Sequence, residues 1–143
     1  MRVRVGVQVQ PQHGEFDRMR RAWREAEEIG ADCIYTWDHF YPLRGEPEGR
    51  HFEGLACLAS LAENTQRAEV GALVFCNSYR NPNLLADAHR TIDHISGGRS
   101  CSGSAPAGSP RTTRSTATSS APRPTGCARC AATCRSCASA CGG

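Results

Sequence analysis

The composition of the chain changes abruptly after Arg99. Residues 100–143 use only seven kinds of amino acid, namely Ser, Cys, Ala, Gly, Pro, Arg and Thr. Because this stretch has no Val, Ile, Leu, Met or aromatic residue, it cannot bury a hydrophobic core. We therefore expect residues 1–99 to form the folded domain and residues 100–143 to form a disordered, low-complexity tail.

The charged residues divide at the same point. Residues 1–99 hold all 14 acidic residues and 12 of the 17 arginines, whereas the tail has five arginines and no acid. The net charge of +3 therefore does not indicate a nucleic-acid-binding surface. There is no apolar run of the ~20 residues that a membrane span needs, and the N-terminus lacks an apolar signal core. We expect a cytoplasmic protein with no nucleic-acid or membrane partner.

Hydrophobic periodicity in the first part alternates between that of strands and that of helices. The pattern predicts strands at residues 3–9, 33–37 and 70–75, and amphipathic helices at residues 16–29, 55–62 and 82–95. Three cysteines of this part, Cys33, Cys57 and Cys76, lie among apolar residues and are expected to be small buried side chains. The predicted order is β-α-β-α-β-α.

Regular alternation of this kind is typical of parallel strands with helices packed outside them. The third predicted strand is apolar almost throughout, as a sheet buried on both faces requires. A doubly wound sheet and an eight-stranded barrel both fit. The first turn, Gln-Pro-Gln-His-Gly at residues 10–14, lacks the G-x-G-x-x-G of dinucleotide-binding folds. We therefore predict an α/β chain that forms the N-terminal portion of a TIM (β/α)8 barrel.

The codons of the tail suggest where its composition comes from. All seven amino acids have G or C as the second base of every codon. The chain has no lysine, which indicates a GC-rich gene whose third bases are nearly all G or C. Loss of one nucleotide would move those third bases into the second position. We restored the missing nucleotide and translated the tail again with GC-rich codons. One translation that the codons allow begins VVLGIGAGWF, which reads as a strand and a glycine turn. It continues into an aromatic loop and an amphipathic helix. We infer that the tail is frameshift-derived.

The cysteines of the tail offer a competing interpretation. Cys127, Cys130, Cys134 and Cys137 have spacings that invite a zinc or iron–sulfur site. Steps of three and four are also the heptad spacing of a leucine stripe. The cysteine codon TGC arises when leucine CTG followed by C is read out of frame. We therefore expect no metal site. The alternative from another class is a cysteine-rich metal-binding or interaction tail on an α/β domain.

Three short segments carry a resemblance to a known family. They are Trp-Asp-His-Phe at residues 37–40, Asn-Ser-Tyr-Arg-Asn-Pro at 77–82 and Ile-Ser-Gly-Gly-Arg at 95–99. In this order the chain resembles the luciferase-like monooxygenase superfamily, and among its branches the F420-dependent oxidoreductases. The resemblance covers residues 1–99. It implies a (β/α)8 barrel that holds coenzyme F420 and a small-molecule substrate at the C-terminal ends of its strands. An FMN-dependent luciferase-like monooxygenase is the alternative.

The resemblance also implies roles for residues that follow the second and third strands. His39 would be the catalytic acid–base group, which suits a side chain that titrates near neutral pH. Asp38 would contact the cofactor. A non-proline cis peptide near Ala72 and Leu73 would follow the cofactor ring, and Phe75 would line it.

The remaining polar residues of the first part are expected to have other roles. Arg80, ahead of the third predicted helix, could face a phosphate, but we expect it to face solvent. We expect His13, His51, His89 and His94 to be surface or satisfied groups. Because three strands cannot close a barrel, we expect the chain as given to be truncated, inactive, and prone to self-association through open sheet edges.

The frameshift predicts a specific pattern in the gene. Before the codon for Arg99, the G and C bias should lie in the third codon position, and after it in the second. Restoring one base should extend the barrel sequence. Sequencing this region of the gene checks both expectations. A tail with the ordinary third-position bias would instead favour a genuine cysteine-rich segment, as would stoichiometric zinc that is lost when Cys130 is replaced by Ser.

Overall fold

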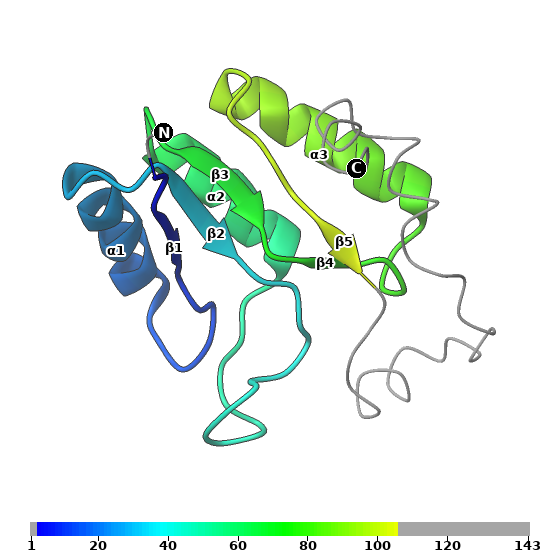
Figure 1. Cartoon of the computed structure of the whole chain (residues 1–143). Coiled ribbons are helices and arrows are strands. Elements are labelled where there is room, and N and C mark those ends of the chain that lie inside the picture. The colour runs from blue at the N-terminus through cyan, green and yellow to red at the C-terminus, as the bar shows by residue number, and fades with distance from the viewer. Residues whose placement is uncertain (1–2, 106–143) are drawn as a thin grey trace.

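The computed structural model describes residues 3–105 of the chain. The elements follow one another in the predicted order (Figure 1). They are β1 (Gly6–Gln8), α1 (Phe16–Glu28), β2 (Cys33–Thr36), α2 (Gly54–Asn64), β3 (Glu69–Ala72), β4 (Phe75–Cys76), α3 (Pro82–Ser96) and β5 (Ser104–Ala105). The alternation of strands and helices expected from the periodicity is confirmed.

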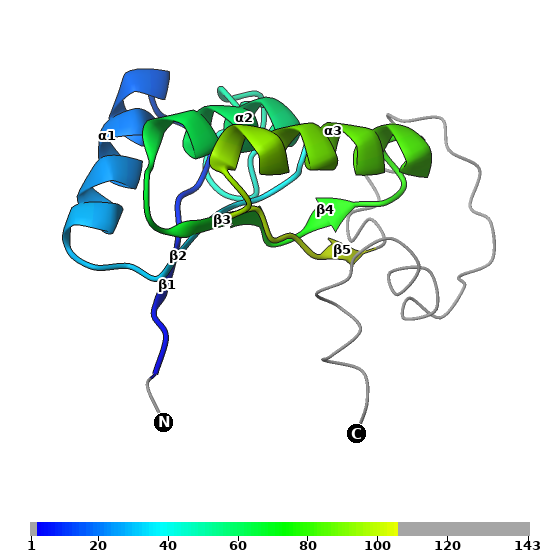
Figure 2. The ribbon, with the colours of Figure 1, turned by 90° about the horizontal axis from the view of Figure 1, so that it is seen from above.

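The first three strands form one parallel sheet in the order β1-β2-β3. Gly6 pairs with Cys33, and Ile34 pairs with Val70. Figure 2 shows that α1, α2 and α3 lie on the same side of this sheet. Parallel neighbours need crossover connections, and right-handed crossovers that follow one direction along the sheet leave every helix on one face. No helix within residues 3–105 covers the opposite face, which would be the inside of a closed barrel.

The hydrophobic core lies between the sheet and the helices. Helix α1 contributes Met19, Trp23 and Ala26, whose spacing of three and four residues places them on one face. The largest fully buried apolar side chains come from each layer: Trp23, Ile34, Leu58, Leu61, Val70 and Phe75. Cys33, Cys57 and Cys76 are buried free thiols, as their apolar neighbourhoods predicted.

Arg99 closes the C-terminal end of α2, where helix carbonyls have no partners within the helix. Its guanidinium donates to the backbone oxygens of Ala62, Thr65 and Ala68 at 2.7–3.0 Å, and to Thr65 Oγ1 at 3.1 Å. Its Nε donates to the backbone oxygen of Ser96 at 2.7 Å. One side chain therefore connects the end of α2, the start of β3 and the end of α3.

Glu27 of α1 binds the turn between α2 and β3, which Arg99 also contacts. Its carboxylate accepts hydrogen bonds from the backbone N–H groups of Gln66, Arg67 and Ala68 at 2.7–3.1 Å. Burial acts to raise the pKa of Glu27, but the three backbone donors outweigh it and hold that pKa below its usual value. The turn into β3 thus depends on a charged acceptor from α1.

Two strands differ from the sequence-based prediction. The strand expected at residues 3–9 is limited to Gly6–Gln8, and Val3 and Val5 are 81% and 56% exposed. Among the described residues β1 has a partner strand on one side only, so little holds its ends in the sheet. The strand expected at 70–75 divides into β3 and β4, and the peptide bond between Leu73 and Val74 is cis.

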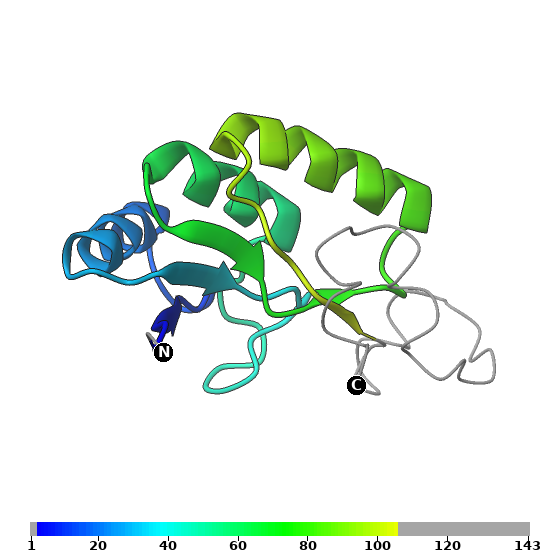
Figure 3. The same ribbon diagram turned by 45° about the horizontal axis from the view of Figure 1, so that its top comes forward.

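The boundary predicted after Arg99 is wrong for residues 100–105. Cys101 N donates to Val70 O at 2.8 Å, and Phe75 N donates to Gly103 O at 2.8 Å. Figure 3 shows this segment running beside β3 and β4 and ending in β5. Backbone hydrogen bonds need no apolar side chains, which explains why composition did not reveal the segment. The rest of the predicted tail lies outside the described residues.

Removing the Arg99 guanidinium should destabilise the domain. In Arg99→Ala the carbonyls of Ala62 and Ala68 lose a charged donor, so the free energy of unfolding should fall by about 2 kcal/mol. Urea unfolding followed by tryptophan fluorescence measures this. The exposed Arg21 gives the matched control, because Arg21→Ala should change stability by less than about 0.5 kcal/mol. Equal effects of the two substitutions would contradict the role assigned to Arg99.

Candidate functional site

The candidate site begins where β2 ends. Strand β2 stops at Thr36, at the carboxyl edge of the sheet (Figure 1). Trp37, Asp38 and His39 follow it directly in the chain. In barrels of parallel strands the functional residues gather at this edge. The predicted motif therefore lies at the position where a barrel enzyme has its catalytic mouth.

Asp38 is 2% exposed, and its carboxylate is held by three donors. Arg80 donates from Nη1 to Oδ2 at 2.6 Å and from Nη2 to Oδ1 at 2.8 Å, and Cys76 N donates to Oδ2 at 3.0 Å. A Cβ added at Gly54 would lie 2.6 Å from Oδ1 of Asp38, so only glycine fits at the start of α2. The carboxylate is thus enclosed by groups from β4, α2 and the loop before α3.

The expectation that Arg80 faces solvent is wrong. Its side chain is 12% exposed and bridges Asp38 and Glu53. Hydrogen bonding to Asp38 raises the pKa of Arg80 above its usual value, so the guanidinium stays charged. The sequence offered one signal: Arg80 lies just before the Asn81-Pro82 start of α3, at the same edge of the sheet as Asp38.

His39 is half-buried at this edge. The ring of Trp37 contacts it edge-on, with centroids 5.8 Å apart and planes at 72°. Burial lowers the pKa of His39, while the nearby Asp38 carboxylate acts in the opposite direction. A histidine with a lowered pKa is neutral at pH 7 and can accept a proton.

The residues on both sides of His39 pair with the same loop. Asp38 binds Arg80, and Phe40 stacks on Tyr79 with centroids 4.2 Å apart and planes at 17°. An ion pair and an aromatic stack therefore connect residues 38–40 to residues 79–80. This double contact holds the backbone of His39, in the loop after β2, against the loop that follows β4.

The residues predicted on the third strand do not all lie together. Leu73 is 55% exposed, and its carbonyl accepts a hydrogen bond from Gln8 Nε2 at 2.8 Å. Ala72 and Phe75 are buried in the core, and the Phe75 ring lies edge-on to His89 with centroids 6.3 Å apart. The cis peptide lies between Leu73 and Val74, one bond later than predicted.

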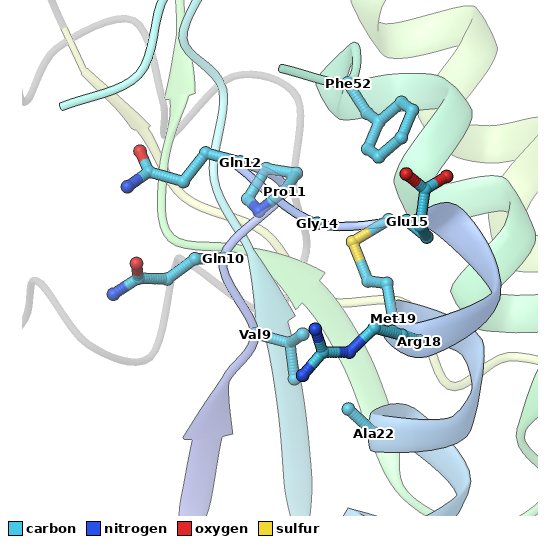
Figure 4. A pocket seen from close by; sticks show the side chains of 10 residues that line it. All are labelled: Val9, Gln10, Pro11, Gln12, Gly14, Glu15, Arg18, Met19, Ala22 and Phe52. Atoms are coloured by element: carbon cyan, nitrogen blue, oxygen red, sulfur yellow. The ribbon is translucent and has the colours of Figure 1, made fainter. Parts of the chain in front are cut away.

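A shallow pocket lies beside this edge rather than at the predicted residues. Its volume is about 210 Å³, and it lies between the loop after β1 and the start of α1 (Figure 4). Val9, Met19 and Phe52 supply apolar walls, and the charged residues Glu15 and Arg18 also line it. None of the residues assigned to the site from the sequence lines it.

Metal ligation has no geometric support in the described part of the chain. Within residues 3–105, no three His, Cys, Asp or Glu side chains are arranged to hold a metal ion. The tail cysteines of the competing interpretation lie outside the described residues. No helix within residues 3–105 has the length and apolar character needed to cross a membrane.

The parallel sheet, the helices on one face and the polar groups at the carboxyl edge of β2 are the arrangement of the N-terminal part of an α/β barrel. The sequence profile of luciferase-like monooxygenases matches residues 1–123, and the chain belongs to this family. The resemblance noted in the sequence is therefore confirmed.

Curated relatives are similar over part of their length. F420-dependent glucose-6-phosphate dehydrogenase of Amycolatopsis mediterranei (strain U-32) is 39% identical over 90 residues, which is 62% of this chain and 26% of the relative. The enzyme of the same name from Kribbella flavida is 36% identical over 101 residues, which is 69% of this chain and 30% of the relative. The chain thus spans under a third of these relatives.

Solved structures share the fold at low sequence identity. An F420-dependent tetrahydromethanopterin reductase from Methanopyrus kandleri superposes with a TM-score of 0.68 at 22% identity, over 84% of this chain and 31% of that one. A type II Baeyer–Villiger monooxygenase from Pseudomonas putida, solved with FMN, gives 0.68 at 14% identity, over 85% and 34%. These likenesses confirm that the described residues form part of a TIM-barrel fold.

The Asp38–Arg80 pair should couple strongly in a double-mutant cycle. Arg80→Met leaves a buried carboxylate without its cation, which should cost about 3 kcal/mol of stability. Asp38→Leu combined with Arg80→Met should cost less than the sum of the single changes, because no buried carboxylate is left unpaired and Glu53 is half exposed to water. Urea unfolding of the four proteins measures the coupling.

The exposed pair of Arg90 and Asp87 on α3 gives the matched control. Both side chains are more than half exposed, so the same cycle there should give a coupling of only about 0.5 kcal/mol. Equal coupling in the two pairs would contradict the view that Asp38 and Arg80 form a buried anchor.

Proposed function

We propose that this chain carries the first part of the active site of an F420-dependent oxidoreductase that acts on a small organic substrate. The observation that carries the proposal is the placement of His39, half-buried and fixed from both sides at the carboxyl edge of β2. The names of the curated relatives support F420 as the cofactor. F420 supplies a hydride acceptor or donor when it is bound.

In this proposal His39 moves the proton that accompanies hydride transfer. Oxidation of an alcohol releases one hydride from carbon and one proton from oxygen, and neutral His39 can accept that proton. Because burial lowers the pKa of His39, the ring is ready to accept a proton at pH 7 and to return it in the reverse reaction. The contacts of Asp38 with Arg80 and of Phe40 with Tyr79 keep the imidazole in place.

The residues present fit the cofactor in part. His39 and the exposed Leu73 are available at the open face and the carboxyl edge of the sheet. Asp38, Ala72 and Phe75 are buried against the helices or the following loop. We therefore propose that these three residues shape the wall behind the cofactor site, and that Asp38 acts by holding Arg80 and the N–H of Cys76.

An FMN-dependent monooxygenase remains the second candidate. A structural neighbour solved with FMN matches the described fold as well as the F420-dependent reductase does, with a TM-score of 0.68 in both cases. Both cofactors carry a tricyclic ring and a phosphate group, so they place similar demands on a barrel mouth. Comparing the affinity of the protein for F420 with its affinity for FMN separates the two candidate functions.

We also propose that the 143-residue chain alone is inactive and self-associates. The described sheet has an outer edge at β1, where Val3 and Val5 are exposed, and no helix within residues 3–105 covers its inner face. Open edges and uncovered apolar faces promote pairing between chains. Sedimentation velocity over a range of concentrations tests this, and a strictly monomeric chain would contradict it.

The cofactor experiment compares two proteins, the 143-residue chain and the product of the frame restored after Arg99. We expect the restored protein to bind F420 more tightly than FMN, and the 143-residue chain to bind neither at micromolar concentrations, since phosphate-binding loops of such barrels come late in the chain. Titration followed by absorbance measures both affinities.

Replacement of His39 tests its role in the restored protein. His39→Asn should leave F420 affinity within a few-fold and lower kcat by about 100-fold or more, as expected for a lost acid–base group. His94→Asn, on the exposed part of α3, is the matched control and should leave both unchanged. Full activity of His39→Asn, or preferential binding of FMN, would overturn the proposed function.

A further inference from the structure

A second histidine lies next to the candidate acid–base group. Trp37 Nε1 donates a hydrogen bond to His51 Nε2 at 3.1 Å. The same indole ring is in edge contact with the ring of His39. Trp37 is 9% exposed, and its indole contacts both histidines, His51 through a hydrogen bond and His39 through a ring edge.

The backbone around His51 is fixed to the loop after β1. Phe52 N donates to Pro11 O at 2.9 Å, and His13 N donates to Arg50 O at 2.9 Å. The residues on both sides of His51 are thus hydrogen-bonded to the same loop, and Gln12 and His51 form an antiparallel bridge. His51 has little freedom to move away from Trp37.

The hydrogen bond also determines the protonation state of His51. An indole N–H only donates, so His51 Nε2 must carry a lone pair, and the proton of the neutral ring lies on Nδ1. Burial and the nearby His39 and His13 lower the pKa of His51, while Asp38 and the backbone of Phe52 act in the opposite direction.

The other charged neighbours in sequence are already paired. Arg50 binds Glu15, and Glu53 binds Arg80. Arg80 also binds Asp38, so this group keeps one net negative charge, but burial is the largest influence on the pKa of His51 and lowers it. The neutral form with an unprotonated Nε2 is therefore the form that the surroundings favour at pH 7.

We propose that His51 is a positioning residue, which holds the Trp37 indole so that its edge fixes the ring of His39. The importance of His51 for proton transfer rests on the proposed function. The contact by which His51 holds Trp37 against His39 does not depend on that function. Without His51, the indole would lose its hydrogen-bond acceptor and could rotate away from His39. His39 would then gain contact with water.

The test uses the 15N-labelled 143-residue chain and long-range 1H–15N spectra of its imidazole rings across a pH titration. At pH 7.5 His51 should show an unprotonated Nε2 and a protonated Nδ1. In His51→Leu, the pKa of His39 should rise toward its usual value, because the ring becomes better solvated. In His51→Gln the side-chain oxygen can accept from Trp37, and the His39 titration should stay as in the parent chain.

Three results would overturn the proposal. They are a protonated Nε2 on His51 at pH 7.5, an unchanged His39 titration in His51→Leu, and an equal shift in His51→Leu and His51→Gln. The exposed His94 supplies the matched control, since His94→Gln should leave the spectra of His39 and His51 unchanged. The spectra need no cofactor. Failure to bind F420 would therefore count against the proposed function alone. An unchanged pKa of His39 in His51→Leu would count against the positioning role of His51 alone.

Discussion

Parallel strands cannot be joined by tight turns, and this constraint governs the rest of the molecule. Each link between β1, β2 and β3 must cross over the sheet, and here each crossover is a helix on the same face. One face of the sheet is consequently packed against α1, α2 and α3, and the core forms there. The carboxyl ends of all the strands meet at one edge, where the loops that carry the chemistry lie close together.

Polar contacts, together with the stack of Phe40 on Tyr79, hold that edge in shape. The loop after β2 is fixed to the segment before α3 by the Asp38–Arg80 ion pair, and to the loop after β1 by contacts around His51. At the opposite end, Arg99 and Glu27 satisfy backbone groups of the turn between α2 and β3. Asp38 is buried, and a buried charge is stable only when its partners are complete, so the ion pair restricts the two loops that it joins to one arrangement.

The family assignment gives these contacts a functional setting. A luciferase-like barrel needs its cofactor and substrate at the carboxyl edge of the strands, which is where His39 lies. Of the five residues that the resemblance associated with chemistry, His39 and Leu73 are accessible, whereas Asp38, Ala72 and Phe75 are buried. In the proposed function, the buried residues act through what they hold in place. Arg80, Trp37 and His51 are the residues that we propose as supports of this site.

The sequence by itself determined the order of elements, the faces of the helices and the family, because hydrophobic periodicity and short motifs are local properties of the chain. It could not determine that Arg80 turns inward to Asp38, or that residues 100–105 join the strands. Each of these depends on hydrogen-bond partners about 30 to 40 residues away in the chain, so it carries no periodic signal. Only the tertiary structure brings those partners together.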